Sequence, residues 1–183
     1  MKNVLVPLAQ GCEEIEAVTI IDLLRRAGIN VVSAGLDDQP VRASRGTRLL
    51  ADTTLDNALQ QDFDMVVLPG GQPGTDNLNN DPRISALLKK MANSGKFTAA
   101  ICAAPSVLAN AGLLNSKQAT GYPGVLENMQ LQNVMLKDQA VVRDGLVLTS
   151  RGPGTAMDFA LELIETLVGQ ERRDEVEAAL ARS

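Results

Sequence analysis

The sequence predicts an α/β fold, in which a mostly parallel sheet lies between layers of helices, and two observations support this prediction. First, an apolar segment at residues 4–9 is followed by a helical pattern at 13–27 and a second apolar segment at 29–34. A strand, a helix and a strand within about thirty residues form a βαβ unit, whose strands run parallel. Second, further buried-type segments at residues 65–68 and 97–101 alternate with helical patterns.

Turn and cap signals define the elements of the first half of the chain. The first helical pattern has apolar residues on one side, namely Ile15, Val18, Ile21 and Leu24. Gly28 follows it and suits the left-handed residue that often ends a helix. Beyond the second strand, we expect Val41 and residues 48–51 to pair as a hairpin around residues 44–46.

Similar signals define the second half. Pro82 suits the first turn of a helix, where its missing N–H group has the least effect. A short helix is expected at residues 105–111, and Asp144-Gly145 is typical of a hairpin turn between two short strands. Residues 156–167 form the clearest helical pattern, which an amphipathic tail helix follows.

Composition narrows the class of protein. The chain has 183 residues, which fits one domain spanning 1–183, and a net charge of −5 with 2% aromatic residues. An acidic chain with few aromatic rings is a poor binder of nucleic acid, because it has neither surplus positive charge nor stacking surfaces. No apolar run reaches the ~18 residues of a membrane span, and we see no secretory signal at the N-terminus.

The counts of cysteine and histidine limit the possible chemistry. Two cysteines are too few for a disulfide framework and favour the reducing cytoplasm. The chain has no histidine, which excludes Ser-His and Cys-His catalytic pairs and the common zinc sites that contain histidine. We expect no metal and no cofactor. Because the chain has no histidine, any catalysis must use a base other than imidazole.

Cys102 is the strongest candidate for chemistry, because it directly follows the strand predicted at residues 97–101. Sites in open parallel sheets form at the carboxyl ends of strands. Small residues flank the thiol and Pro105 opens a helix, which is typical of a nucleophile elbow. The free N–H groups at the helix start are expected to lower the thiol pKa below about 8.5. On spacing alone, a buried structural cysteine is an equally good interpretation.

Glu16 is the second candidate. Glu13 and Glu14, in the same helical turn, are expected mainly to complement the helix dipole. Glu16 instead heads an apolar stripe with Ile20 and Leu23, so partial burial should raise its pKa. If its carboxyl faces the candidate cysteine, we expect a protonated acid beside a thiolate, with one proton shared by the pair.

Residues 70–74, Gly-Gly-Gln-Pro-Gly, follow the strand predicted at 65–68. Glycines at this position let backbone N–H groups approach a ligand closely, as an oxyanion hole requires. The loop matches neither a P-loop nor the GxGxxG spacing, so nucleotide binding is unsupported, and an ordinary Pro-Gly turn is the alternative. Cys12, after the first strand, is interpreted as an incidental, exposed loop thiol.

These segments together resemble the ThiJ/PfpI superfamily and, within it, the relatives of the parkinsonism-associated protein deglycase. The similarity spans nearly the whole chain. The matching segments are residues 11–16 (GCEEIE), 25–29 (RRAGI), 44–45 (SR), 67–71 (VLPGG), 99–103 (AAICA) and 144–155 (DGLVLTSRGPGT).

The resemblance implies a flavodoxin-like three-layer sandwich with a twisted, mostly parallel sheet, a nucleophile elbow at Cys102 and Glu16 as its protonated partner. It also implies that backbone N–H groups around Gly71 and Ala103, beside Gly70, bind an oxyanion or an oxidised sulfur.

The resemblance further implies a homodimer. Arg45 and Arg26 match positions that line or approach the pocket at the dimer interface, with Glu13 nearby. Close relatives often carry a histidine near the reactive cysteine. Here Tyr122 takes that place in a loop at residues 121–124 and offers a phenol, which is no base near neutral pH.

Members of this superfamily are described as deglycases and glyoxalases that act on glyoxal, methylglyoxal and their early adducts. The first expectation is therefore an enzyme whose substrates are small carbonyl compounds or glycated protein side chains. Other members are described as oxidative-stress sensors or chaperones. The alternative is therefore a redox sensor or redox-regulated chaperone, in which Cys102 is oxidised to sulfinate and catalysis is incidental.

Overall fold

A seven-stranded sheet forms the centre of the computed structural model, which describes residues 1–182. Its strand order is β10-β11-β7-β6-β1-β2-β5, and only β10 and β11 run antiparallel to each other. The strands of this sheet are β1 (Asn3–Leu8), β2 (Asn30–Gly35), β5 (Thr53–Thr54), β6 (Met65–Leu68), β7 (Phe97–Ile101), β10 (Val141–Asp144) and β11 (Val147–Ser150). Two small pairs lie outside it, β3 (Val41–Arg42) with β4 (Arg48–Leu49) and β8 (Gln118–Ala119) with β9 (Met135–Leu136).

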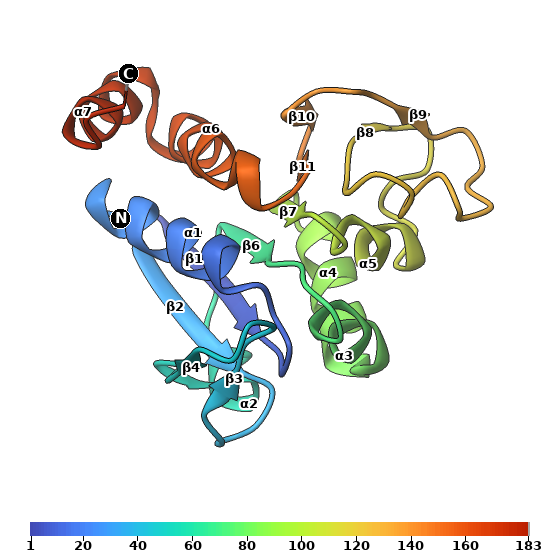
Figure 1. The fold of residues 1–183 in the computed structure, drawn as a ribbon, viewed down its shortest axis with the longest axis horizontal. Helices are drawn as coiled ribbons and strands as arrows, with labels where there is room; N and C mark the ends of the chain where they lie inside the picture. The colour runs from blue at the N-terminus through green and yellow to red at the C-terminus, as the bar shows by residue number, and fades with distance from the viewer. Residues whose placement is uncertain (183) are drawn as a thin grey trace.

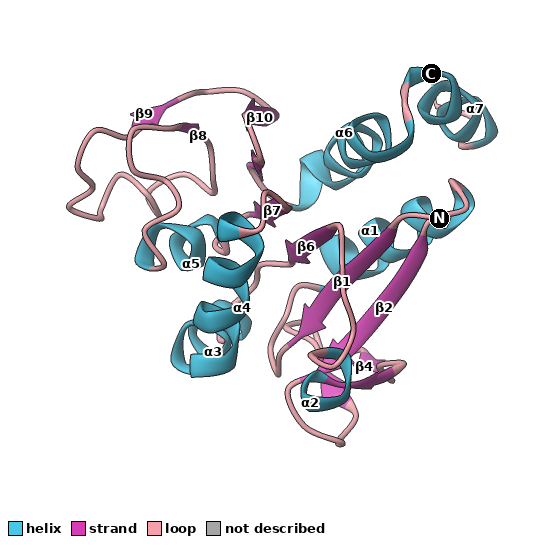
Figure 2. Ribbon diagram, turned by 180° about the vertical axis from the view of Figure 1, so that it is seen from behind, coloured by secondary structure: helices cyan, strands magenta, loops and turns pink. Residues whose placement is uncertain are grey.

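Helices cover both faces of the sheet, which confirms the predicted three-layer sandwich (Figures 1 and 2). One face carries α1 (Glu14–Arg26), α6 (Ala156–Val168) and α7 (Gln170–Ala179), with the 3-10 turn η1 (Pro153–Thr155) leading into α6. The other face carries α2 (Leu55–Ala58), α3 (Gly74–Asn80), α4 (Pro82–Asn93) and α5 (Pro105–Asn110).

Strand β1 shows why apolar runs without alternation form the middle of this sheet. Val4, Val6 and Leu8 pack into the core under α1 and α6. Leu5 and the following Ala9 pack into the core on the opposite face. Because successive side chains of a strand point to opposite faces, a strand that is covered on both sides must be apolar throughout.

Several short elements were not predicted from the sequence. These are β5, α2, α3, β8 and β9. Helix α3 has the sequence GTDNLNN, whose single large apolar residue is Leu78, so no helical period is visible. The two-residue strands are held by backbone pairing with a neighbouring strand, which leaves little trace in side-chain patterning.

The path of the chain brings the predicted site segments together. After β1 the chain passes to β2 on one side, and it later returns to β6 on the other side of β1. This reversal is a topological switch point, where open α/β sheets place their ligand sites. The segments that follow β1, β6 and β7 therefore meet at one edge of the sheet.

In the part of the chain that the structure describes, the longest helices, α1 and α6, have 13 residues each. No helix there has both the length and the apolar character that crossing a membrane would demand.

Candidate functional site

The turn after β7 has the geometry of a nucleophile elbow. Cys102 adopts φ 65, a left-handed conformation that non-glycine residues seldom occupy. Its N–H donates to the Ser150 carbonyl at 3.0 Å, and its own carbonyl accepts from the Tyr122 N–H at 2.7 Å. These two bonds hold the turn and leave the side chain 8% exposed. Pro105 then begins α5.

Backbone amides surround the sulfur atom. The N–H groups of Gly71 and Ala103 donate hydrogen bonds to Cys102. Gly71 has φ 89, so the loop after β6 depends on glycine to turn its amide this way. Gly70 allows close approach, since a Cβ there would lie 2.6 Å from the Cβ of Cys102. The loop after β6 is therefore packed directly against the elbow.

The first turn of α1 brings Glu16 to the same place. Glu13 caps the helix, because its Oε2 accepts from the Glu16 N–H at 2.9 Å. The Glu16 side chain is fully buried, and its Oε2 accepts from the Gly70 N–H at 2.7 Å. Its carboxyl also interacts with the Cys102 thiol. Within residues 1–182 the other oxygen, Oε1, has no hydrogen-bond partner.

Burial opposes the charged form of both groups. Burial raises the pKa of Glu16 to about 7, although hydrogen bonds from Gly70 and Cys102 favour its ionised form. The pKa of Cys102 is raised to about 12, by burial and then by the negative charge of Glu16. The prediction of a lowered thiol pKa is therefore wrong, because the amides of Gly71 and Ala103 only partly offset these two effects.

The two groups titrate as one system, which holds a single proton between its pKa values of about 7 and about 12. With that proton on Glu16, a Cys102 thiolate would have three donors around it, namely the carboxylic acid and the amides of Gly71 and Ala103. Oε1 is the buried oxygen of Glu16 that has no hydrogen-bond partner, and a proton placed on it would turn it into a donor. The pair can thus supply both a nucleophile and a proton donor without imidazole.

The structure does not bring the two predicted arginines to this cysteine within one chain. Arg26 pairs with Asp22 at 2.7 Å at the far end of α1. Arg45 is exposed in the β3–β4 loop, and its N–H donates to the carboxylate of Glu14 at 3.0 Å. Glu14 also accepts from Ser44 Oγ at 3.1 Å. Its role therefore exceeds the predicted complement to the helix dipole, because it fixes the loop that carries Arg45.

Cys12 differs from its prediction as well. Its side chain is 1% exposed, so it is a core thiol rather than an exposed loop residue. Burial raises its pKa to about 12, and the charges of Glu14 and Glu13 add to this effect. Cys12 is therefore poorly suited to act as a nucleophile near neutral pH.

Sequence reasoning missed Gly152 as a site residue. A Cβ on Gly152 would lie 3.3 Å from Cδ2 of Tyr122 and 4.0 Å from Sγ of Cys102. From the sequence, residues 151–154 were interpreted only as the start of the long helix. The matching segment at 144–155 was the one available signal, and it does not show that this glycine adjoins the sulfur.

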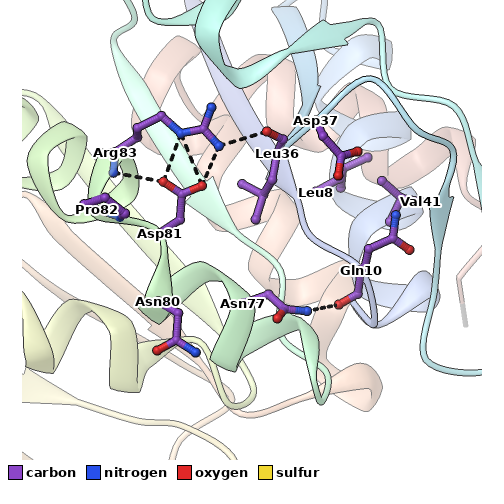
Figure 3. A pocket seen from close by; sticks show the side chains of 10 residues that line it. All are labelled: Leu8, Gln10, Leu36, Asp37, Val41, Asn77, Asn80, Asp81, Pro82 and Arg83. Atoms are coloured by element: carbon purple, nitrogen blue, oxygen red, sulfur yellow. Dashed lines mark hydrogen bonds and ion pairs between the residues drawn. The ribbon is translucent and has the colours of Figure 1, made fainter.

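A separate hollow of about 540 Å³ lies beyond the ends of β1 and β2 (Figure 3). Several of its charged and amide groups are bound to the surrounding loops. Arg83 contacts Asp81 at 2.5 Å, Asp56 at 2.8 Å and the Leu36 carbonyl at 2.8 Å. Asn77 donates to the Gln10 carbonyl at 2.8 Å. Cys102 does not line this hollow, so it lies apart from the cysteine site.

The fold and this site together define a class, the doubly wound α/β proteins with a cysteine at a nucleophile elbow. The model of the DJ-1/PfpI family matches residues 2–166. The chain therefore belongs to the DJ-1/PfpI family.

Named relatives support this assignment. Protein dj-1beta of Drosophila melanogaster is 43% identical over 180 residues, which cover 98% of this chain and 96% of the relative. A Caenorhabditis elegans relative named glutathione-independent glyoxalase DJR-1.2 is 38% identical and matches 89% of this chain and 87% of its own length. The chain spans only 46% of protein DJ-1 homolog A of Arabidopsis thaliana, to which it is 42% identical.

Solved structures agree with the fold. The crystal structure of Drosophila melanogaster DJ-1beta has a TM-score of 0.95 and 42% identity, and the match covers 100% of this chain and 98% of that chain. The structure titled Toxoplasma gondii DJ-1, oxidized, has a TM-score of 0.93 and 38% identity, with full coverage of both chains.

Variants at Glu16 test the shared proton. In the wild type, the rate at which iodoacetamide alkylates Cys102 should rise in a step near pH 7, where the pKa of Glu16 lies. Glu16→Gln and Glu16→Leu have no titrating group at this position, so the step should disappear. Glu16→Gln keeps an N–H donor for the thiolate, and its remaining ionisation should therefore have a lower midpoint pH than that of Glu16→Leu.

The measurement is the pH profile of alkylation, followed by mass spectrometry of the Cys102 peptide. Asp22→Asn, which removes a half-exposed acid of the same helix, is the control and should keep the wild-type profile. One common profile for the wild type and both Glu16 variants would exclude Glu16 from the control of the thiol.

Proposed function

We propose that the protein is a cysteine-dependent glyoxalase and deglycase that needs no cofactor. Its substrates would be glyoxal, methylglyoxal and the early adducts that these aldehydes form with amines and thiols, including protein side chains. The observation that carries the proposal is the contact of Cys102 with Glu16 and with the amides of Gly71 and Ala103. The glyoxalase name of the Caenorhabditis elegans relative supports an enzymatic role.

The first step uses the shared proton. The Cys102 thiolate attacks the aldehyde carbon of methylglyoxal, and a C–S bond forms as the C=O π electrons move to the oxygen. The Gly71 and Ala103 amides, which lie beside the sulfur, stabilise the developing oxyanion. Glu16 gives its proton to that oxygen, which yields a neutral hemithioacetal and a carboxylate.

The second step isomerises the hemithioacetal to a thioester. The Glu16 carboxylate takes the proton from the former aldehyde carbon, a C=C bond forms, and the ketone oxygen takes up the hydroxyl proton, which gives an enediolate. Glu16 then delivers its proton to the neighbouring carbon as the C=O bond of the thioester forms on Cys102. Water attacks the thioester carbon and gives one proton to Glu16, the C–S bond breaks, and lactic acid leaves as lactate and a proton, which restores the thiolate and the protonated acid. The net reaction adds one water molecule to methylglyoxal. With glyoxal the product is glycolate, and an early adduct also releases its repaired amine or thiol.

Removal of the thiol tests this reaction. Cys102→Ser should abolish both the consumption of methylglyoxal and the formation of lactate, because a serine hydroxyl at this position has no base strong enough to ionise it. Lactate is measured directly by mass spectrometry, so that reversible trapping of the aldehyde is not counted as turnover. Circular dichroism should show an unchanged fold.

Cys12→Ser is the matched control, since Cys12 is buried and lies outside the set of groups around the Cys102 sulfur. It should retain activity. Full lactate formation by Cys102→Ser would refute the proposed reaction.

A second candidate function is redox sensing, in which Cys102 is oxidised to sulfinate. Two features favour it: amides that are already directed at the sulfur, and a similar solved structure that is titled oxidized. The same donors that stabilise an oxyanion would bind sulfinate oxygens. Both cysteines are free, as a thiol-based sensor in the reducing cytoplasm requires.

Peroxide titration distinguishes sensing from random oxidation. Cys102 should gain two oxygen atoms and then stop, while Cys12 lags behind because it is 1% exposed and its pKa is raised. Intact and peptide mass spectrometry follow both thiols. Parallel oxidation of the two cysteines would contradict the sensor proposal, and negligible aldehyde turnover by the unoxidised protein would favour it over the enzyme.

We also propose that two copies of the chain pair through the outer face of α1. Ile15 is 55% exposed, Val18 48% and Leu50 82%, so apolar side chains gather on this face. Val18 and Leu50 line one hollow of about 370 Å³. A twofold interface there would remove this apolar surface from water and would let Arg45 approach the cysteine site of the other copy.

A charge on this face should separate the copies. Val18→Glu is expected to sediment as a monomer where the wild type sediments as a dimer, because pairing would bury the new carboxylate. Leu146→Glu, at a turn where the leucine is 38% exposed, is the control and should remain dimeric. A monomeric wild type, or an unchanged Val18→Glu dimer, would contradict this interface.

A further inference from the structure

Position 152 favours glycine because a side chain there would lack space, and its backbone conformation does not require glycine. Its φ of 167 and ψ of −165 describe extended backbone that other residues also adopt. A Cβ there, however, would lie 3.3 Å from the Tyr122 ring and 4.0 Å from Sγ of Cys102. It would touch the sulfur and crowd the ring. The missing side chain therefore keeps open the space between the phenol and the thiol.

One side of this opening is held more tightly by hydrogen bonds than the other. The Gly152 backbone is held, because its N–H donates to Thr155 Oγ1 at 3.2 Å and its carbonyl accepts from the Thr155 N–H at 2.9 Å. The backbone of Tyr122 is tied to the Cys102 carbonyl at 2.7 Å, but the residue is 50% exposed. One wall of the opening is thus fixed backbone, and the other is an aromatic ring whose torsions determine the width.

Other directions toward the sulfur are already occupied. Glu16 and the amides of Gly71 and Ala103 surround it, and Cys102 is only 8% exposed. The space between Tyr122 and Gly152 is a further side of the sulfur, which a Cβ on Gly152 would partly fill, so a carbonyl compound that approaches there displaces none of these stabilising groups.

We propose that Tyr122 and Gly152 form an aperture over the Cys102 thiol that selects electrophiles by the size of the group beside the reacting carbon. The aperture admits aldehydes with a hydrogen or a methyl group there, as in glyoxal and methylglyoxal, and rejects aryl-substituted ones. This inference rests on the proposed function for its natural substrates, but access to the thiol can be measured without turnover.

The test compares alkylation of Cys102 by iodoacetamide, which is small, and by N-phenylmaleimide, which is bulky. The rate with each reagent is divided by the rate of the same reagent with free cysteine. The normalised rate for N-phenylmaleimide is then divided by the normalised rate for iodoacetamide. Tyr122→Ala should raise this ratio by about tenfold or more, and Gly152→Ala should lower it by a similar factor, as expected for a site fitted to within one methyl group. A changed fraction of thiolate alters both rates by the same factor and cancels in the ratio.

Two matched variants complete the test. Tyr122→Phe keeps the ring and should keep the ratio. Gly154→Ala adds a methyl in the same loop, where a Cβ would meet nothing within 4 Å, and should also keep the ratio. The kcat/KM values for phenylglyoxal relative to methylglyoxal should follow the same order among the variants.

An unchanged ratio in Tyr122→Ala would overturn the aperture, and so would an unchanged ratio in a folded Gly152→Ala. Because Tyr122→Ala removes a half-exposed ring and adds no new contact, it decides the matter even if Gly152→Ala fails to fold. A wild type without aldehyde turnover would refute the proposed function, whereas the alkylation ratio would still test the aperture separately.

Discussion

The contact between a buried carboxyl and a buried thiol is the constraint on which the rest of this site depends. Glu16 is fully buried and Cys102 is 8% exposed, so neither group is well solvated as an anion. Two adjacent negative charges would be far more costly than one. The pair therefore keeps at least one proton at and above neutral pH, up to the Cys102 pKa of about 12, and the amides of Gly71 and Ala103 favour a charge on the sulfur. An acid with a raised pKa thus lies beside the thiol in a chain that has no histidine.

Close backbone packing makes this contact possible. The Glu13 N–H donates to the Gly70 carbonyl at 2.9 Å, and the Gly70 N–H donates to Glu16 at 2.7 Å, so the loops after β1 and β6 are joined twice. A side chain at Gly71 would meet the Glu13 nitrogen at 2.5 Å. Glycine here gives the amides their direction and brings α1 close to the elbow. The proposed catalysis and the proposed oxidation of Cys102 would both use these donors.

Much of the fold was predictable because its signals are local. The mostly apolar runs of β1, β6 and β7 indicate strands that are covered on both faces, and Asp81-Pro82 marks the start of α4, whose N-cap is Asp81. The short elements β5, α2 and α3 left no such pattern. The apolar stripe predicted only that Glu16 is partly buried, and its pairing with Cys102 was implied by the family resemblance; the structure brings the two together.

The sequence by itself determined which residue types are available, namely a cysteine at a strand end, an acid at the head of an apolar stripe and glycines at a second strand end, with no imidazole. Only the tertiary structure decided the direction of the Cys102 pKa, the burial of Cys12 and the place of Gly152 beside the sulfur. The reason is physical. Desolvation and steric contact depend on distances between segments that are far apart in the chain, and no local pattern of residues records those distances.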